Sequence, residues 1–280
     1  MESVLQVRNL KISYRSRAGE AFAAVEDLSL DVAPGTTVGL MGESGCGKSS
    51  VALALLGLLP KENSEVSGSV RFLGTELLPS NDRALQKIRG AGISLIHQEP
   101  SLALSPMLRA GDQVAEVIRA HRTWPWKKCR VEALAMLDRV GLRDARRIFR
   151  SYPHQLSGGQ CQRIVLAQAL SCSPRLLIAD EPTAHLDARG QLEFLALLDQ
   201  LQRQSALALL LISHAPEVQA RLADRILIMR AGRILEEGRL ADLRDHSPHP
   251  YTRSLLRSHL RPSAPGESLA SNLAAQELAR

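Results

Sequence analysis

Four short apolar runs, each followed by a polar or glycine-rich segment, set the organisation of this chain. The runs cover residues 36–41, 91–96, 175–179 and 206–213 and are rich in aliphatic side chains. Apolar runs of four to eight residues bounded by turn residues are typical of buried strands. Such strands predict a mostly parallel sheet covered by helices, which makes this an α/β protein.

Other periodicities surround this predicted core. Residues 1–35 show partial period-two alternation and end in a Pro-Gly turn, and residues 67–74 form a further strand-like run; we expect an antiparallel β region here. Residues 107–154 carry apolar positions at helical spacing, which predicts an inserted helical subdomain near 101–156. Helices are also expected over residues 50–59, ended by Pro60, and over residues 161–169.

The first apolar run leads into a complete match to the pattern G-x-x-x-x-G-K-[ST]. A strand, a glycine-rich turn and a helix are the context in which this pattern binds phosphate, because backbone N–H groups and the helix N-terminus converge there. Lys48 would reach the β- and γ-phosphates, and the Ser49 hydroxyl would bind Mg²⁺. A tight turn with an exposed lysine is the alternative, but the flanks favour a nucleoside triphosphate site. The predicted loop and helix start comprise Gly42, Glu43, Ser44, Gly45, Cys46, Gly47, Lys48, Ser49 and Ser50.

The other three apolar runs end in side chains suited to phosphate chemistry. Gln98 follows the second, Asp180 and Glu181 the third, and His214 the fourth. Ligands of open parallel sheets bind at the carboxyl ends of the strands, so we expect one nucleotide site to gather all four ends. Gln98 suits magnesium ligation or water orientation, Asp180 suits the metal, and Glu181 suits polarisation of the attacking water. Taken singly, a polar loop residue at 98 and a charged strand cap at 180–181 remain alternatives.

Two further features bear on ligand binding. Tyr14 can stack on a nucleobase, although an ordinary strand aromatic is the alternative. Ser157, Gly158, Gly159 and Gln160 open a predicted helix and make a second anion-binding end without a lysine; a plain helix cap is the alternative.

Composition narrows the class of protein. The longest apolar run, residues 206–212, is too short to cross a bilayer, and the start of the chain lacks the order of a secretory signal, so we expect a cytosolic protein. The four cysteines lack metal-ligand or disulfide spacing. Cys46 lies at a helix N-terminus, where a thiol pKa falls, so we expect alkylation there to inactivate the protein unless the nucleoside triphosphate is bound.

The net charge of +6 is concentrated in one segment. Residues 107–154 hold eleven Lys and Arg against five Asp and Glu. A solvated helical face explains this, and a surface facing anionic lipid or an acidic partner is the functional alternative. Nucleic acid is not supported, because aromatic side chains do not interleave with the charges.

These motifs, in this order over roughly residues 4–258, resemble the ATP-binding subunits of ABC transporters. The resemblance implies the α/β fold of an ABC ATPase, with a P-loop NTPase core sheet, an N-terminal antiparallel β region and the inserted helical subdomain. It also implies that two ATPase subunits pack head to tail, with Ser157, Gly158 and Gly159 of each contacting the γ-phosphate bound by the other. Tyr14 becomes the adenine-stacking residue, Gln98 the Q-loop residue, Glu181 the catalytic base and His214 the switch histidine. Asp187 matches the aspartate of the D-loop at the dimer seam.

The subgroup that the chain looks most similar to is the dipeptide, oligopeptide and nickel importers, on the evidence of residues 52–60, 111–117, 152–156 and 249–252. It implies an ATP-hydrolysing subunit on the cytoplasmic side of the plasma membrane. Its partners would be two transmembrane permeases, a same or related ATPase and, indirectly, an extracytoplasmic solute-binding protein. Uptake of di- or oligopeptides is the expected function. Nickel or another small solute is an alternative, and so is a soluble ABC ATPase acting on nucleic acid or ribosomes.

Some residues depart from the family pattern. His185 replaces a small D-loop residue, and Ala215 follows His214 where the family often has Asp. Many peptide-importer members carry cysteines for an iron–sulfur cluster in a C-terminal extension, but here none follows Cys172, so we expect no cluster. We assign residues 1–258 to the ATP-binding domain and expect residues 259–280 to form a flexible tail.

Overall fold

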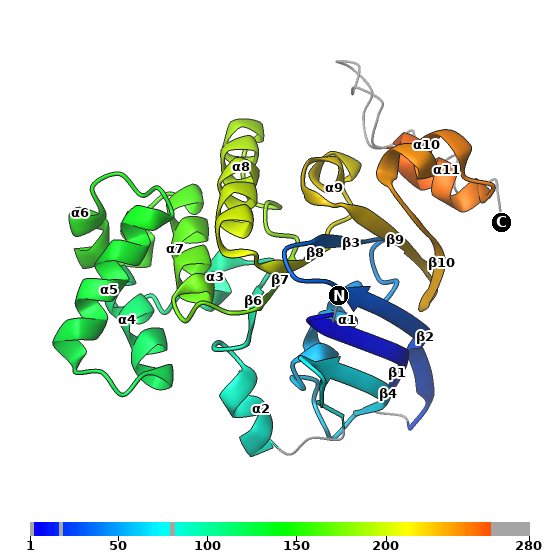
Figure 1. The fold of residues 1–280 in the computed structure, drawn as a ribbon, viewed down its shortest axis with the longest axis horizontal. Coiled ribbons are helices and arrows are strands. Elements are labelled where there is room, and N and C mark those ends of the chain that lie inside the picture. The colour runs from blue at the N-terminus through cyan, green and yellow to red at the C-terminus, as the bar shows by residue number, and fades with distance from the viewer. Residues whose placement is uncertain (1–2, 17–18, 79–81, 259–280) are drawn as a thin grey trace.

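A computed structural model of the chain describes residues 3–16, 19–78 and 82–258 (Figure 1). Within those ranges the strands form one sheet in the order β5-β4-β1-β2-β10-β9-β3-β8-β7-β6. The strands are β1 (Leu5–Arg15), β2 (Ala21–Val32), β3 (Thr37–Met41), β4 (Ser64–Phe72), β5 (Thr75–Glu76), β6 (Ile93–Ile96), β7 (Leu176–Asp180), β8 (Ala208–Ile212), β9 (Arg225–Arg230) and β10 (Arg233–Gly238). The helices are α1 (Lys48–Leu55), α2 (Asp82–Ile88), α3 (Pro100–Ala103), α4 (Ala110–His121), α5 (Trp126–Arg139), α6 (Ala145–Arg150), α7 (Gly158–Leu170), α8 (Ala188–Ser205), α9 (Pro216–Leu222), α10 (Leu240–His246) and α11 (Pro250–Ser258), with a 3₁₀ turn at Pro153–Gln155.

The four predicted core strands lie in the parallel part of the sheet, which β9 extends by pairing in parallel with β3. β6, β7, β8 and β3 pair in parallel, and every residue of β3, β7 and β8 is buried. Burial on both faces is the reason that these runs are continuously apolar rather than alternating. The predicted α/β core is confirmed, and it places the carboxyl ends of the four strands at one edge.

The helix after the phosphate-binding pattern ends earlier than the sequence predicts. α1 stops at Leu55, and Gly57 adopts a left-handed conformation with φ of 59°. The Gly57 N–H bonds to the Ala54 carbonyl and the Leu58 N–H to the Leu53 carbonyl, which is a glycine-type helix ending. Pro60 therefore does not end this helix, and that expectation was wrong.

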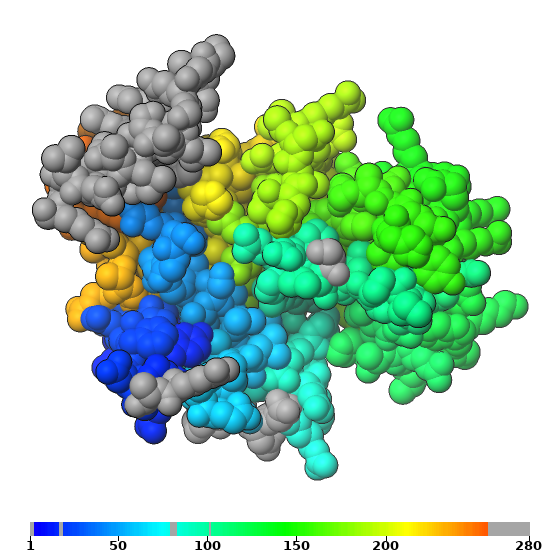
Figure 2. Space-filling view, turned by 180° about the vertical axis from the view of Figure 1, so that it is seen from behind, coloured from blue at the N-terminus to red at the C-terminus, as the bar shows by residue number. Residues whose placement is uncertain are grey.

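The N-terminal strands form the predicted antiparallel β region. β1 pairs with β2 on one side and with β4 on the other. One parallel pairing, Arg233 of β10 with Asp27 of β2, joins this region to the core sheet. In Figure 2 these strands (blue) lie on the opposite side of the molecule from the inserted helices (green).

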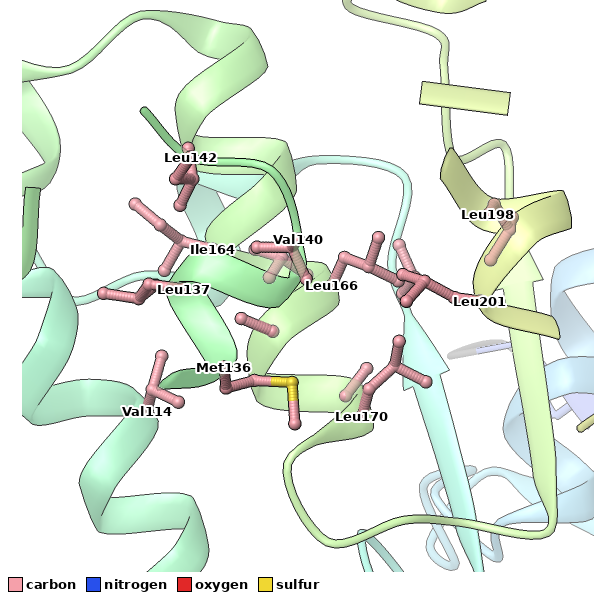
Figure 3. Close-up of a cluster of buried hydrophobic side chains, with 14 of the residues drawn as sticks. Val114, Met136, Leu137, Val140, Leu142, Ile164, Leu166, Leu170, Leu198 and Leu201 are labelled. Carbon is pink, nitrogen blue, oxygen red and sulfur yellow. The ribbon is translucent and has the colours of Figure 1, made fainter. Parts of the chain in front are cut away.

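The inserted helices α4, α5 and α6, here called the helical region, lie between β6 and β7 in the chain. Their apolar faces pack onto α7, in one buried cluster that continues to α8 (Figure 3). The labelled members are Val114, Met136, Leu137, Val140, Leu142, Ile164, Leu166, Leu170, Leu198 and Leu201. Truncating one such leucine to alanine costs about 2–5 kcal/mol, so the cluster ties the helical region firmly to the core. The exact domain boundaries near 101–156 and at 258 stay predictions.

The last described elements, α10 and α11, pack beside β9 and β3. Leu243, Leu255 and Leu256 are buried against Met41, Ile226 and Ile228 of those strands. This packing brings α11 next to Met41, the last residue of β3. Figure 1 shows α11 beside α10. The predicted flexible tail, residues 259–280, lies outside the described residues.

Candidate functional site

One cavity of about 830 Å³ lies at the carboxyl edge of the core strands. The segments after β3, β6, β7 and β8 all contribute to its wall, as the sequence predicts. The predicted residues that line it are Tyr14, Gly42, Glu43, Ser44, Gly45, Gly47, Lys48, Ser49, Ser50, Gln98, Asp180, Glu181 and His214. Side chains that are far apart in the sequence therefore surround a single space large enough for a nucleotide.

Two glycines, Gly42 and Gly47, shape the phosphate loop (residues 42–49), because a side chain at either position would clash with the backbone. Gly47 has φ of 107°, and a Cβ there would lie 2.4 Å from the Ala24 carbonyl oxygen. A Cβ at Gly42 would lie 2.2 Å from the Met229 carbonyl oxygen. These close approaches let the loop fold tightly over the N-terminus of α1, where its N–H groups face incoming phosphate.

Lys48 is buried at the first position of α1. Its Nζ donates to the carbonyl oxygens of Gly42 and Glu43, each at 2.8 Å. The ammonium is therefore held inside the loop by two backbone acceptors. Both lie beside the space that a triphosphate would occupy.

Cys46 does not have the reactive character that its position suggests. It is only 8% exposed, and burial raises the pKa of its thiol, with the ammonium of Lys48 opposing the rise. Desolvation therefore outweighs the helix-terminus effect. The expectation of a lowered pKa was wrong, and Cys46 packs behind the loop rather than lining the cavity.

Glu181 is held in an unusual backbone conformation directly after β7. Its φ is 47°, a left-handed value that is rare outside glycine and asparagine and that is often found at functional sites. Its Oε1 lies 2.6 Å from Nδ1 of His214 and accepts the backbone N–H of His214 at 2.8 Å. Its Oε2 accepts the Ser213 hydroxyl at 3.1 Å. The end of β8 thus holds the carboxylate in one orientation at the cavity.

Asp180 has the features of a metal ligand. It is 4% exposed, and its Oδ1 is buried with no hydrogen-bond partner among the described residues. Burial raises the pKa of this carboxyl, and a hydrogen bond from Ser49 opposes the rise. An unpaired buried carboxylate oxygen beside a hydroxyl is a donor set that fits Mg²⁺.

Two aromatic rings stack on each other in the wall of the cavity. Tyr14 hydrogen-bonds through its hydroxyl to the Ser50 hydroxyl at 3.0 Å, and its ring stacks on Phe22 with centroids 5.5 Å apart. Phe22 is 58% exposed and also lines the cavity. The pair offers the cavity an aromatic surface on which a nucleobase can stack.

The predicted residues 157–160 and Asp187 lie at the starts of α7 and α8, outside the lining of this cavity. Ser157 caps α7, and its side chain accepts the Gln160 N–H while Gln160 bonds back to the Ser157 N–H. Asp187 caps α8 by accepting the Gly190 N–H at 2.7 Å. A separate cavity of about 560 Å³ is lined by Ser157, Gly159, Gln160, Leu186 and Gly190, among others. Both helix starts share this surface, and neither reaches the nucleotide cavity of the same chain.

The family model described as ABC transporter matches residues 25–184. The chain belongs to the ABC transporter ATPase family. It is 42% identical over 259 residues to the dipeptide transport ATP-binding protein DppD of Bacillus subtilis, covering 92% of this chain and 77% of that one. It is 39% identical over 268 residues to the oligopeptide transport ATP-binding protein OppD of Escherichia coli, covering 96% and 79%.

A solved structure of the ATP-binding cassette MJ0796, a dimer bound to ADP and Pi, superposes with a TM-score of 0.74 at 28% identity, covering 84% of this chain and 98% of that one. The predicted family and the predicted fold are both confirmed, and the chain is an ABC-type ATPase. Among the described residues, no helix combines the length and the apolar character that a membrane span needs.

Sequence reasoning missed several residues of this ABC ATPase cavity. Phe22, Ala24, Ser254 and Leu255 also line it. Phe22 belongs to an alternating strand, and its pairing with Tyr14 depends on a register that the sequence does not reveal. Ser254 and Leu255 follow the segment 249–252, which indicated the subgroup but carried no predicted role.

Proposed function

We propose that this chain is the ATP-hydrolysing subunit of an importer for dipeptides or oligopeptides. The observation that carries the proposal is the identity of 39–42% to DppD and OppD over more than nine tenths of the chain. That similarity extends well beyond the segment 25–184 that the general family model matches. Peptide transport is what the names of those relatives state, and here it is the proposed cargo.

In this proposal the cavity binds ATP across its length. The adenine stacks on Tyr14, and the phosphates lie on the loop 42–49 with Lys48 at the β- and γ-phosphates. Ser49, Asp180 and Gln98 would hold Mg²⁺, which neutralises charge on the phosphate oxygens when it is bound. The unpaired Oδ1 of Asp180 supports that assignment.

Glu181 acts as the base that polarises the attacking water, and His214 is the switch histidine that senses the γ-phosphate. The carboxylate already lies between the Ser213 hydroxyl and the His214 ring, so little reorganisation is needed. A positioned general base contributes about 10²–10⁴-fold to a rate. The water is placed by Gln98 and Glu181 on the side of the γ-phosphate that faces away from the loop.

A second ATPase subunit completes the site. Ser157, Gly158, Gly159 and Gln160 of each subunit face the γ-phosphate that the other binds, with Asp187 at the seam. These residues do not line the cavity of their own chain, which supports this arrangement. The MJ0796 cassette, crystallised as a dimer, is a precedent. The chain is peripheral at the cytoplasmic face of the membrane. Its helical region passes the movement of the two ATPase subunits to two permease subunits. A solute-binding protein delivers the cargo.

Uptake in the native cells tests this function. Cells lacking the chain are supplied with the wild type or with Glu181→Gln, and entry of a labelled tripeptide is compared with entry of labelled Ni²⁺. We expect the wild type alone to restore peptide entry, and Ni²⁺ entry to be the same in all strains. Restoration of Ni²⁺ entry alone would assign the cargo to nickel, and equal peptide uptake by the Glu181→Gln strain would contradict the catalytic role.

A further inference from the structure

The helix α11 touches the phosphate loop directly. The hydroxyl of Tyr251 accepts the backbone N–H of Glu43 at 3.2 Å, although the two residues are 208 positions apart. Ser254 and Leu255, one helical turn further on, line the nucleotide cavity. This helix lies outside the segment 25–184 that the family model matches.

The position of the Tyr251 ring is fixed from several sides. The guanidinium of Arg230 lies over the ring, 4.7 Å from its centroid. The next residue, Thr252, is fully buried and donates its hydroxyl to the carboxylate of Glu236. The same carboxylate accepts the Ser247 hydroxyl at 2.7 Å. Cation–π contact and buried polar anchors both restrict the ring, so the hydroxyl is presented to Glu43 in one place.

Apolar packing links the helix to the strand that carries the phosphate loop. Leu255 and Leu256 are buried against Met41 and Ile228. Met41 is the last residue of β3 and immediately precedes Gly42. The helix therefore braces the loop both through its strand and through the Tyr251 hydroxyl.

The first peptide units of the loop are held from two sides. Lys48 donates to the Gly42 and Glu43 carbonyl oxygens, and Tyr251 accepts from the Glu43 N–H. An arriving phosphate attracts the Lys48 ammonium, which must then divide its donors between phosphate and backbone. The bond to Tyr251 uses neither Lys48 nor the inner face of the loop, so it can hold the loop while Lys48 engages the phosphates.

We propose that Tyr251 is a positioning residue of the nucleotide site, and that α11 forms a wall that keeps the phosphate loop in its binding shape. The inference rests on the proposed binding of ATP in this cavity. A loop that is already ordered loses less conformational entropy when the ligand binds, so the ligand binds more tightly. Because the loop contacts the α- and β-phosphates as well as the γ-phosphate, ATP and ADP benefit equally.

Tyr251→Phe in the full chain tests this inference, because it keeps the ring and removes only the hydroxyl. One neutral hydrogen bond corresponds to roughly 3- to 10-fold in affinity. We expect binding of ATP and of ADP with Mg²⁺, measured by calorimetry, to weaken by that factor, and the KM for ATP to rise by the same factor with kcat within about twofold. Hydrogen exchange at the Glu43 amide should accelerate. Tyr152→Phe, which removes a hydroxyl outside the cavity, is the matched control. It should leave nucleotide affinity, KM and hydrogen exchange at Glu43 unchanged.

The outcomes separate the two proposals. If the wild type binds neither nucleotide, the proposed ATP site itself fails, and this inference fails with it. If the wild type binds both nucleotides and Tyr251→Phe binds them equally well, with unchanged exchange at Glu43, only the role of Tyr251 is overturned. A fall in melting temperature with unchanged affinity and KM would also overturn it, because that result assigns a purely structural role.

Discussion

Nδ1 of His214, which follows β8, lies 2.6 Å from Oε1 of Glu181, which follows the neighbouring strand β7. The backbone N–H of His214 donates to the same oxygen, and the Ser213 hydroxyl donates to the other one. The proposed base is thus oriented by the strand that carries the proposed switch residue. A shift in the end of β8 would therefore change the position of the carboxylate.

This geometry predicts that Glu181→Gln stops hydrolysis while leaving ATP binding intact. The amide has the same shape as the carboxylate but cannot take up a proton, so we expect kcat to fall about 100-fold or more. The affinity for ATP should stay within about twofold to threefold, because the phosphates are bound elsewhere in the cavity. Phosphate release and calorimetry measure the two quantities.

Glu217→Gln is the matched control for that experiment. Glu217 is an exposed carboxylate in the first turn of α9, close in sequence to His214. The Glu217→Gln variant should hydrolyse ATP at the wild-type rate. Retention of more than a tenth of the wild-type rate by Glu181→Gln would show that another group is the base.

The aromatic pair predicts that Phe22 contributes to nucleotide binding. A base stacked on an aromatic ring contributes about 1–3 kcal/mol, and the lower end applies here because Phe22 is more than half exposed. Phe22→Ala should therefore weaken ATP and ADP about fivefold, while binding of tripolyphosphate, which has no base, stays unchanged. Leu73→Ala removes another exposed apolar side chain from the same β region and is the control. An equal loss for tripolyphosphate would show that the substitution disturbs the phosphate loop instead.

The buried thiol predicts slow alkylation of Cys46. A raised pKa leaves little thiolate at pH 7, and the reactive fraction grows as the pH rises through and above the ordinary thiol value. Mass spectrometry of the Cys46 peptide after iodoacetamide treatment should show at least about tenfold slower modification in the folded chain than in the chain unfolded by guanidinium at the same pH. Rapid modification of the folded protein at pH 7 would restore the original expectation of an activated thiol.

The basic face of α6 predicts attraction to an anionic membrane surface. Arg146, Arg147 and Arg150 are all exposed there. Each basic residue near such a surface contributes about 1 kcal/mol, so changing all three to Glu should reduce recovery with membranes and leave ATP binding unchanged.

The control for α6 reverses three exposed arginines elsewhere on the surface. Arg71, Arg203 and Arg244 lie in exposed ion pairs outside the helical region, so their reversal changes the net charge by the same amount. If the control lowers membrane recovery as much as the α6 variant, net charge rather than this face is responsible. Unchanged recovery of the α6 variant with membranes would contradict the proposed attraction of α6 to an anionic membrane surface.

The features that the sequence predicted correctly are those that local patterns determine. Apolar runs marked β3, β7 and β8, and the rule that ligands gather at strand carboxyl ends placed Gln98, Asp180, Glu181 and His214 together. Neither step needs knowledge of distant contacts. The sequence also contains a signal for the early end of α1, because Gly57 is a typical helix-ending residue. We placed the end at Pro60 instead, because proline cannot continue a helix.

The features that the sequence did not reveal depend on partners that are distant in the chain. Tyr14 and Phe22 face each other because they are directly paired in the β1–β2 register, which alternation alone does not fix. Cys46 is desolvated by the packing around the loop, so its helix-terminus position gave the wrong direction of pKa shift. The contact of Tyr251 with Glu43 arises only when α11 folds back beside β3.

Affinity purification from the native cells tests the central claim most directly. The tagged full chain is recovered from detergent-solubilised membranes, and its companions are identified by mass spectrometry. We expect two permeases with several membrane spans and an ATPase subunit, either the same chain or a related one. Recovery from the soluble fraction alone, together with nucleic acid or ribosomal proteins, would contradict the importer and support a soluble ABC ATPase instead.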